Sequence, residues 1–260
     1  MNMKLSIITI NYNNLEGLKR TLQSVVNQTW QEFEYIIIDG GSADGSAAYI
    51  EGKSENIDYW VSEPDKGIYN AMNKGIAKAT GEYLLFLNSG DHLFDIQVLF
   101  QNNKFLTSYD FIYFNLNVVG EQETFVKKYP NQLRFSYFLR DSLPHPATFI
   151  KGTIFNKIGL YDESLKIAAD WKFFIQSICK FNYGYKRIDA TLSTFYLDGL
   201  SSDPTNKDII YDEKRKVLSS DFQAYLDDTN CFFELKSTVV NLRQSKKINL
   251  LVKLGLIKKF

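Results

Sequence analysis

Short apolar runs alternate with amphipathic runs over the N-terminal third of the chain. Residues 15–26 and 68–76 repeat apolar side chains every three or four positions, which predicts helices with one buried face. The apolar runs around them are typical of strands covered on both faces, and they lie at 5–10, 33–38, 57–61 and 83–87. Asp44 can cap a further short helix that runs through Ile50. Strands separated by helices in this way predict parallel β-α-β units.

After residue 92 the pattern predicts strands and helices in mixed order. The expected strands are at 110–119 and 124–129, which pair, and at 185–196, which holds one or two strands. The expected helices are at 171–181 and from 207 onward. Asp170 stands at the cap of the first of these helices. Prolines on both sides of His145 predict a rigid, extended segment over 143–146, and residues 198–202 predict a loop.

The composition narrows the class of protein. Hydrophobic residues make up 45% of the 260 residues, which suffices for a large buried core. Lys+Arg and Asp+Glu both number 30, so no net field draws the chain to nucleic acid, and we expect no nucleic-acid partner. There are two cysteines, a polar-flanked start and no apolar run of about 18 residues. We therefore expect a cytoplasmic protein without a disulfide framework, signal peptide or transmembrane span.

Polar residues follow each of the four predicted N-terminal strands. In chain order they are Asn11 and Tyr12, then Asp39, then Glu63 and Asp65, then Asn88 and Asp91. Because the carboxyl ends of parallel strands meet at one edge of a sheet, where such folds bind ligands, these side chains should converge. Asn, Asp and Gly also form turns, so each of these residues taken singly has that simpler interpretation too.

Three segments at these strand ends resemble successive motifs of family 2 glycosyltransferases. They are 6–13 (SIITINYN), 36–46 (IIIDGGSADGS) and 81–91 (GEYLLFLNSGD). A fourth segment, 63–76 (EPDKGIYNAMNKGI), is similar to a subgroup that builds bacterial surface polysaccharides.

The resemblance implies the GT-A fold, an α/β architecture with a Rossmann-like, mostly parallel central sheet flanked by helices. A mixed C-terminal acceptor-side region and a helical tail would follow this sheet. The implied GT-A domain covers 1–205, with a nucleotide-binding half at 1–92 and an acceptor-side half at 93–205. A C-terminal helical extension would cover 206–260.

The resemblance also implies a nucleotide-sugar donor bound at this sheet edge. Asn11 and Tyr12 would pack on the base and ribose. Asp39, which as a carboxylate can only accept a hydrogen bond, would read a uracil-like ring edge. Asp65 is expected in the same site, and Lys66 either reaches the phosphates or is solvated. Gly199 and Ser201 resemble a loop that closes over the donor diphosphate, with a plain turn as the alternative.

A divalent cation, Mn²⁺ or Mg²⁺, is implied as well, because it stabilises the charge of the departing diphosphate. Family members commonly have the sequence Asp-x-Asp-Asp at this site, whereas this chain has Asn88-Ser89-Gly90-Asp91. Asp91 takes the position of the metal ligand, and Asn88 can still offer a carbonyl oxygen. His145 is a candidate contact to the metal or the diphosphate.

Asp170 is the candidate catalytic base, because Ala169-Asp170-Trp171 matches the family's setting for this group at the start of a helix. In the inverting reaction an acceptor hydroxyl attacks the anomeric carbon while the nucleoside diphosphate leaves from the opposite face. The pKa of that hydroxyl lies far above neutrality, so a positioned carboxylate must take its proton. Without the resemblance, a simple helix cap is the alternative for Asp170.

Acceptors in this subgroup are often polyprenyl-linked saccharides at the inner membrane face, so we expect a saccharide or polyprenyl-linked saccharide acceptor. Residues 241–260 interleave Lys and Arg with apolar residues and carry no acidic residue, which suits peripheral binding to an anionic membrane. A solvated terminal helix is the alternative.

Two other classes of protein stay open. One is a nucleotidyltransferase that makes an activated sugar, although residues 11–17 hold one glycine and no arginine for a phosphate loop. The other is an inactive nucleotide-sugar-binding protein, which the reduced Asn88-Ser89-Gly90-Asp91 motif would suit.

Overall fold

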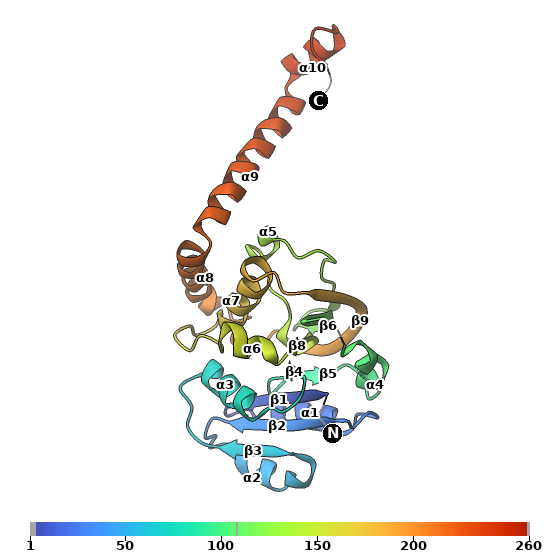
Figure 1. Ribbon diagram of the computed structural model, residues 1–260, viewed down its shortest axis with the longest axis vertical. Helices are drawn as coiled ribbons and strands as arrows, with labels where there is room; N and C mark the ends of the chain where they lie inside the picture. The colour runs from blue at the N-terminus through green and yellow to red at the C-terminus, as the bar shows by residue number, and fades with distance from the viewer. Residues whose placement is uncertain (1–3, 108, 259–260) are drawn as a thin grey trace. The chain divides into compact units, whose positions relative to one another are not determined.

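The computed structural model describes residues 4–107 and 109–258 (Figure 1). Within these residues, a nine-stranded sheet has the order β3-β2-β1-β4-β8-β6-β9-β5, with β7 paired to β6. The chain divides into two compact units, of which the first ends at Glu213 and the second starts at Lys214. The whole sheet belongs to the first unit.

The N-terminal half of the sheet is parallel, as predicted. Its strands are β1 (Leu5–Asn11), β2 (Phe33–Asp39), β3 (Tyr59–Ser62) and β4 (Tyr83–Phe86). The connecting elements are α1 (Leu15–Val26), α2 (Ser46–Glu51), the 3₁₀ turn η1 (Ser54–Asn56) and α3 (Ile68–Lys78). Every residue of β1 and β2 is buried, which explains why these runs lack the alternation of a half-exposed strand.

Helix α3 packs against β1 and β2 and thereby sets the position of the loop that precedes it. Gly75 faces β1 so closely that a Cβ atom there would lie 2.5 Å from Cγ2 of Ile8. Only glycine permits this approach of helix to strand. On α1, the predicted stripe is buried at Leu18, Leu22 and Val25.

The C-terminal half of the sheet is mixed. Its strands are β5 (His92–Leu93), β6 (Phe111–Val119), β7 (Thr124–Lys127), β8 (Thr148–Lys151) and β9 (Tyr185–Tyr196). Strand β8 is antiparallel to both β4 and β6, whereas β9 runs parallel to β6 as one long strand with register shifts. The sequence pattern missed β5 and β8, because runs of two and four residues carry too little periodicity.

Short helices surround this half of the sheet. They are α4 (Val98–Asn102), η2 (Asn103–Phe105), α5 (Phe135–Phe138), η3 (His145–Ala147), α6 (Thr153–Ile158), α7 (Ala169–Ile175), η4 (Gln176–Lys180) and η5 (Pro204–Asn206). An aromatic cluster fixes α7 on the sheet: Phe173 stacks on Phe155 with ring centroids 4.4 Å apart, and Phe174 meets Phe111 of β6 edge to face.

Three local predictions differ from the structure. Helix α2 is preceded by Gly45 rather than Asp44, whose carboxylate accepts from Ser46 N (3.0 Å) and from Leu15 N (2.8 Å), at the start of α1. The cap of α7 is Ala168, so Asp170 lies inside the first turn.

Residues 143–146 are not wholly extended, because η3 begins at His145 and Ala147 N bonds Pro144 O at 3.0 Å. Local sequence cannot distinguish an extended Pro-X-Pro segment from a single 3₁₀ turn, since proline fits both.

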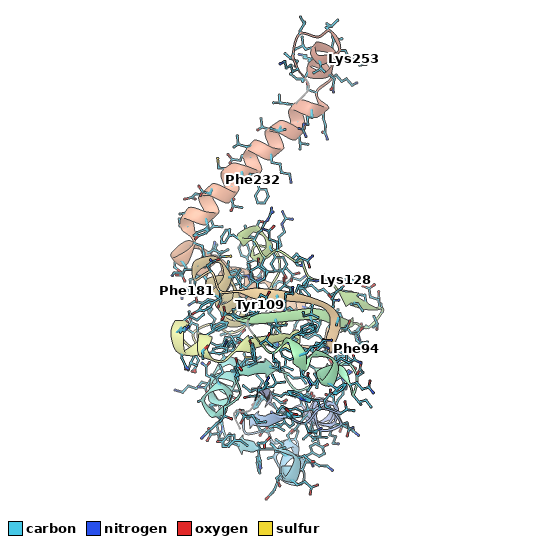
Figure 2. The ribbon with its side chains drawn as sticks, turned by 45° about the vertical axis from the view of Figure 1, so that its right-hand side comes forward. Phe94, Tyr109, Lys128, Phe181, Phe232 and Lys253 are labelled. Carbon is cyan, nitrogen blue, oxygen red and sulfur yellow. The ribbon has the colours of Figure 1, made fainter. Side chains whose placement is uncertain are left out.

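The predicted helical run from residue 207 is present as α8 (Lys207–Asp221), α9 (Gln223–Gln244) and α10 (Lys246–Lys253). Side chains of Phe232 on α9 and Lys253 on α10 project from these helices (Figure 2). Among the described residues, no helix combines the length and apolar character that crossing a membrane requires. Lys259, part of the predicted basic tail, lies outside the described residues.

Candidate active site

Hydrogen bonds cross-link the loops at the carboxyl ends of all four parallel strands. Asn11 Nδ2 at the end of β1 donates to Asp39 Oδ1 at the end of β2 (2.7 Å). Ser62 Oγ at the end of β3 donates to Asp39 Oδ2 (2.6 Å). Asn14 Nδ2 donates to the carbonyl of Ser89 after β4 (3.1 Å). The polar residues that the sequence placed at separate strand ends therefore lie along one edge of the sheet.

Asp39 is fully buried and its carboxylate is saturated. Besides Asn11 and Ser62, both the hydroxyl and the backbone N–H of Ser42 donate to it, at 2.6 and 2.9 Å. Burial acts to raise the pKa of Asp39, but these donors outweigh it and hold the pKa below its usual range. A carboxylate offers about four lone-pair sites. In this structure the four donors occupy these sites, and the contact of Asp39 with a base N–H stays a prediction.

Tyr12 and Asp65 instead line an open part of this edge. The Tyr12 side chain is 66% exposed, whereas Asn11 is 3% exposed and serves Asp39. A Cβ atom on Gly40 would lie 2.5 Å from Asp65 Oδ2 and 3.1 Å from Tyr12 Cδ2, so both side chains flank bare backbone. Lys66 is exposed beside them, with its backbone N–H donating to Asn70 Oδ1 at 3.2 Å.

A chain of polar contacts joins the loop after β4 to helix α7. Asn88 Nδ2 lies 3.2 Å from His145 Nε2, and His145 Nδ1 lies 3.4 Å from Asp170 Oδ2. The Tyr69 hydroxyl of α3 shares its hydrogen between the carbonyl of Ile167 and Asp170 Oδ1, which lies 3.0 Å away. Both ring nitrogens of His145 thus have protein partners in this structure, and its contact with the metal or the diphosphate stays a prediction.

Asp170 is an ionised acceptor in these surroundings. Burial acts to raise its pKa, yet hydrogen bonds from its neighbours, first among them His145, hold the pKa below its usual range. The Tyr69 hydroxyl remains protonated, because burial and the nearby Asp170 charge raise its pKa well above 10. Asp170 is therefore able to take up a proton at neutral pH.

The pKa of Asp91 is shifted in the opposite direction from that of Asp170. Burial raises its pKa to about 7 and outweighs the nearby charges that act on it. Within the described part of the chain no hydrogen bond reaches its carboxylate. The Oδ1 atom of Asn88 is buried without a partner. An unpartnered amide oxygen and a carboxylate from the same loop, 88–91, are ligand types that suit a hard divalent cation, which completes its shell with phosphate and water. The described residues contain no group of three or more acidic, His or Cys side chains able to hold a metal by themselves.

Arg20 of α1 was not identified from the sequence. Its guanidinium lies 4.3 Å from the ring centre of Tyr196 and bonds the carbonyl of Gly90 at 3.4 Å. Tyr196 leads into the loop that contains Gly199 and Ser201, where the carbonyl of Gly199 accepts from Ser202 and Asp203. No local pattern marks Arg20, because its relevance depends on where β9 ends.

Helix α7 is held in place from two sides. Asn73 of α3 bonds both the N–H and the C=O of Tyr161, at 3.0 and 2.9 Å. The Glu213 carboxylate accepts from the backbone N–H groups of 166–168, directly ahead of α7. These contacts explain part of the 63–76 motif, because its Asn73 anchors the segment that leads to Asp170.

A pocket of about 280 Å³ lies beside Arg20, between α1 and residues 93–96. None of the residues predicted from the sequence lines it.

The fold and this edge define a glycosyltransferase of the GT-A type. The sequence model described as "Glycosyl transferase family 2" matches residues 6–155, and the chain belongs to this family. An uncharacterized glycosyltransferase of Mycobacterium tuberculosis is 37% identical over 177 residues, which cover 66% of this chain and 68% of that protein. A PGL/p-HBAD biosynthesis glycosyltransferase of Mycobacterium bovis is 30% identical over 177 residues, which again cover 66% of this chain and 68% of that protein.

Solved structures agree on the fold. Residues 1–349 of S. aureus TarS, in complex with UDP-GlcNAc, superpose with a TM-score of 0.65 at 19% identity, covering 85% of this chain and 68% of that chain. In another TarS structure this chain spans 37% of the other chain. The mannosyltransferase PcManGT from Pyrobaculum calidifontis, in complex with GDP-Man and Mn²⁺, has a TM-score of 0.58 at 14% identity, covering 96% and 83% of the two chains.

Proposed function

We propose that this chain transfers a sugar from a nucleoside-diphosphate sugar, with UDP-sugars favoured, to an acceptor hydroxyl with inversion. The acceptor oxygen attacks the anomeric carbon as the bond from that carbon to the diphosphate oxygen breaks. The bonding electrons leave with the nucleoside diphosphate, and the acceptor proton passes to Asp170. The observation that carries the proposal is the contact chain from Asn88 through His145 to Asp170, which joins the donor edge to an ionised base.

The nucleoside is proposed to lie against the exposed Tyr12 ring and the backbone of Gly40. Asp65, with Oδ1 occupied by Gly67 N–H at 2.9 Å, keeps Oδ2 for a base or ribose donor. For Asn11 and Asp39, which are hydrogen-bonded to each other, contact with the base and ribose stays a prediction. Lys66, Gly199 and Ser201 are proposed to approach the phosphates, which suits their exposed positions or, at Gly199, open space around the backbone.

Asp91 and the Oδ1 atom of Asn88 would hold the divalent cation, Mn²⁺ or Mg²⁺. When bound, the cation neutralises charge on the departing diphosphate. The protein's own contribution is the buried Oδ1 atom of Asn88, which has no internal donor, together with the carboxylate of the buried residue Asp91.

The test is Asp170→Asn, which keeps the shape of the side chain and removes its basicity. We expect turnover to fall by about 10²–10⁴-fold, while calorimetric affinity for UDP with Mn²⁺ stays within about twofold of wild type. Asp162→Asn is the matched control, because that carboxylate pairs with Lys172 of α7 at 2.7 Å instead of facing the site. Normal turnover in Asp170→Asn would remove Asp170 from the mechanism. Transferase activity in the wild type would also exclude an inactive sugar-nucleotide binder.

The acceptor is proposed to be a saccharide or polyprenyl-linked saccharide, reached at an anionic membrane through residues 241–258. Leu250, Leu254 and Leu256 are 57%, 62% and 67% exposed, and lysines at 246, 247, 253 and 258 accompany them. Apolar side chains enter the interface while the cations meet anionic lipid headgroups. The predicted cytoplasmic location stays a prediction.

Vesicle binding tests the membrane surface. Replacing Lys246, Lys247 and Lys253 with Gln should weaken binding to vesicles that contain phosphatidylglycerol by about 100-fold, at about 1 kcal/mol per lysine. The same change at the exposed lysines 53, 104 and 157 is the control and should have little effect. Equal binding of both triple variants would refute this surface.

A further inference from the structure

His145 lies between the candidate cation site and the candidate base, and it contacts both. The preceding and following prolines, together with hydrogen bonds from Thr148 Oγ1 to Pro144 O (2.7 Å) and from Ser193 Oγ to Pro146 O, hold its turn in place. Its side chain is 17% exposed, so little solvent competes for the ring nitrogens.

The partners determine the tautomer that we assign to His145. Ionised Asp170 can only accept, so Nδ1 must carry the hydrogen, and in the neutral ring Nε2 is then a lone pair. A lone pair requires a donor, and Asn88 presents its Nδ2 at 3.2 Å. The other end of the same amide, Oδ1, consequently points to a buried place without a partner. A cation on Oδ1 would favour this amide orientation, since the alternative orientation turns two N–H groups toward the positive charge.

We propose that Asn88 and His145 form a positioning relay that couples occupancy of the donor cation site to the orientation of the base Asp170. The inference rests on the proposed function and gives His145 a role other than metal binding. A cation on Asn88 Oδ1 fixes the orientation of the amide, so that Nδ2 donates to Nε2 of His145. This bond favours the Nδ1–H tautomer of the ring, and Nδ1–H in turn orients the Asp170 carboxylate.

Two substitutions separate the two contacts of the ring. In His145→Asn the amide nitrogen lies two bonds from Cβ, as Nδ1 does, so it can keep the bond to Asp170 and lose Asn88. In His145→Gln the amide oxygen lies three bonds from Cβ, as Nε2 does, so it can keep Asn88 and lose Asp170. Each lost contact is expected to cost about 10–100-fold, the usual range for outer-sphere partners of metal sites.

We therefore expect His145→Asn to weaken UDP binding in the presence of Mg²⁺ by about 10–100-fold with turnover at saturation near wild type. His145→Gln should keep UDP affinity near wild type and lower turnover by about 10–100-fold. His145→Ala should lose both UDP affinity and turnover. Titration calorimetry and initial rates give the two quantities. Equal defects in the Asn and Gln variants, or a loss of Mg²⁺ affinity common to both with unchanged turnover, would overturn the relay in favour of direct metal binding.

The tautomer of His145 can also be measured by NMR in the wild-type protein, so this test does not depend on whether the variants fold. The chain has two histidines, so long-range ¹⁵N–¹H spectra contain two imidazoles, which His92→Gln assigns. The relay requires a non-protonated Nε2 in His145, and a protonated Nε2 would refute it. Failure of the proposed function itself shows separately, as full turnover of Asp170→Asn.

Discussion

Asp91→Asn tests the electrostatics of the candidate cation site without any assay of transfer. Asp91 is 6% exposed, and burial raises its pKa from 3.8 to about 7. At 1.36 kcal/mol for each tenfold change in proton affinity, keeping this carboxylate charged costs the folded state about 4 kcal/mol as an upper limit. Asparagine has nearly the same shape and no charge to bury. The variant should therefore be more stable than wild type when no cation is bound.

The direction in which stability changes with pH, and the pH range of that change, follow from the same pKa. Below the unfolded pKa of about 4 both states bind the proton, so Asp91 adds no difference between wild type and variant. Between about pH 4 and 7 the folded state holds a proton that the unfolded state releases, so wild-type stability falls as pH rises. The advantage of Asp91→Asn should grow over this range and level off above about pH 7.

Urea unfolding in EDTA at pH 4.5, 6 and 8 measures this advantage, and we expect about 2–4 kcal/mol at pH 8. The exposed Asp95 provides the matched control, Asp95→Asn, for which a pH-dependent gain is not expected. Adding Mg²⁺ with UDP should stabilise wild type and not Asp91→Asn. A variant that is less stable than wild type at pH 8, or an advantage that does not change with pH, would refute the reasoning.

Three further outcomes are expected. Asp39→Asn cannot accept all four hydrogen bonds, so it should lower the free energy of unfolding by about 1–3 kcal/mol; an unchanged free energy of unfolding would contradict the structural importance of these bonds. Tyr69→Phe removes a donor from Asp170 and should raise the pKa of that base, so the acid limb of the kcat/KM profile moves to higher pH; an unmoved limb would contradict the contact. Gly75→Ala places a methyl 2.5 Å from Ile8 and should cost about 1–3 kcal/mol in thermal unfolding; an unchanged midpoint would argue against this packing.

Local sequence was sufficient for the parallel half of the fold. Buried β1 and β2 appear as unbroken apolar runs, and α1 as a three-and-four repeat, because burial and periodicity are local consequences of secondary structure. The position of polar residues after those strands was predictable for the same reason, since parallel strands bring their carboxyl ends to one edge. The identity of the family followed from the motifs at those ends.

Tertiary structure alone decided which of these polar residues are available. Asp39 and Asp91 both follow buried strands, yet one carboxylate has four donors and the other has none among the described residues. That difference arises from chain segments far apart in sequence, such as Ser62 beside Asp39. Likewise the contact of His145 with Asn88 and Asp170 spans 57 and 25 positions. Hydrogen-bond saturation and burial depend on packing between elements, and no periodicity within one element encodes them.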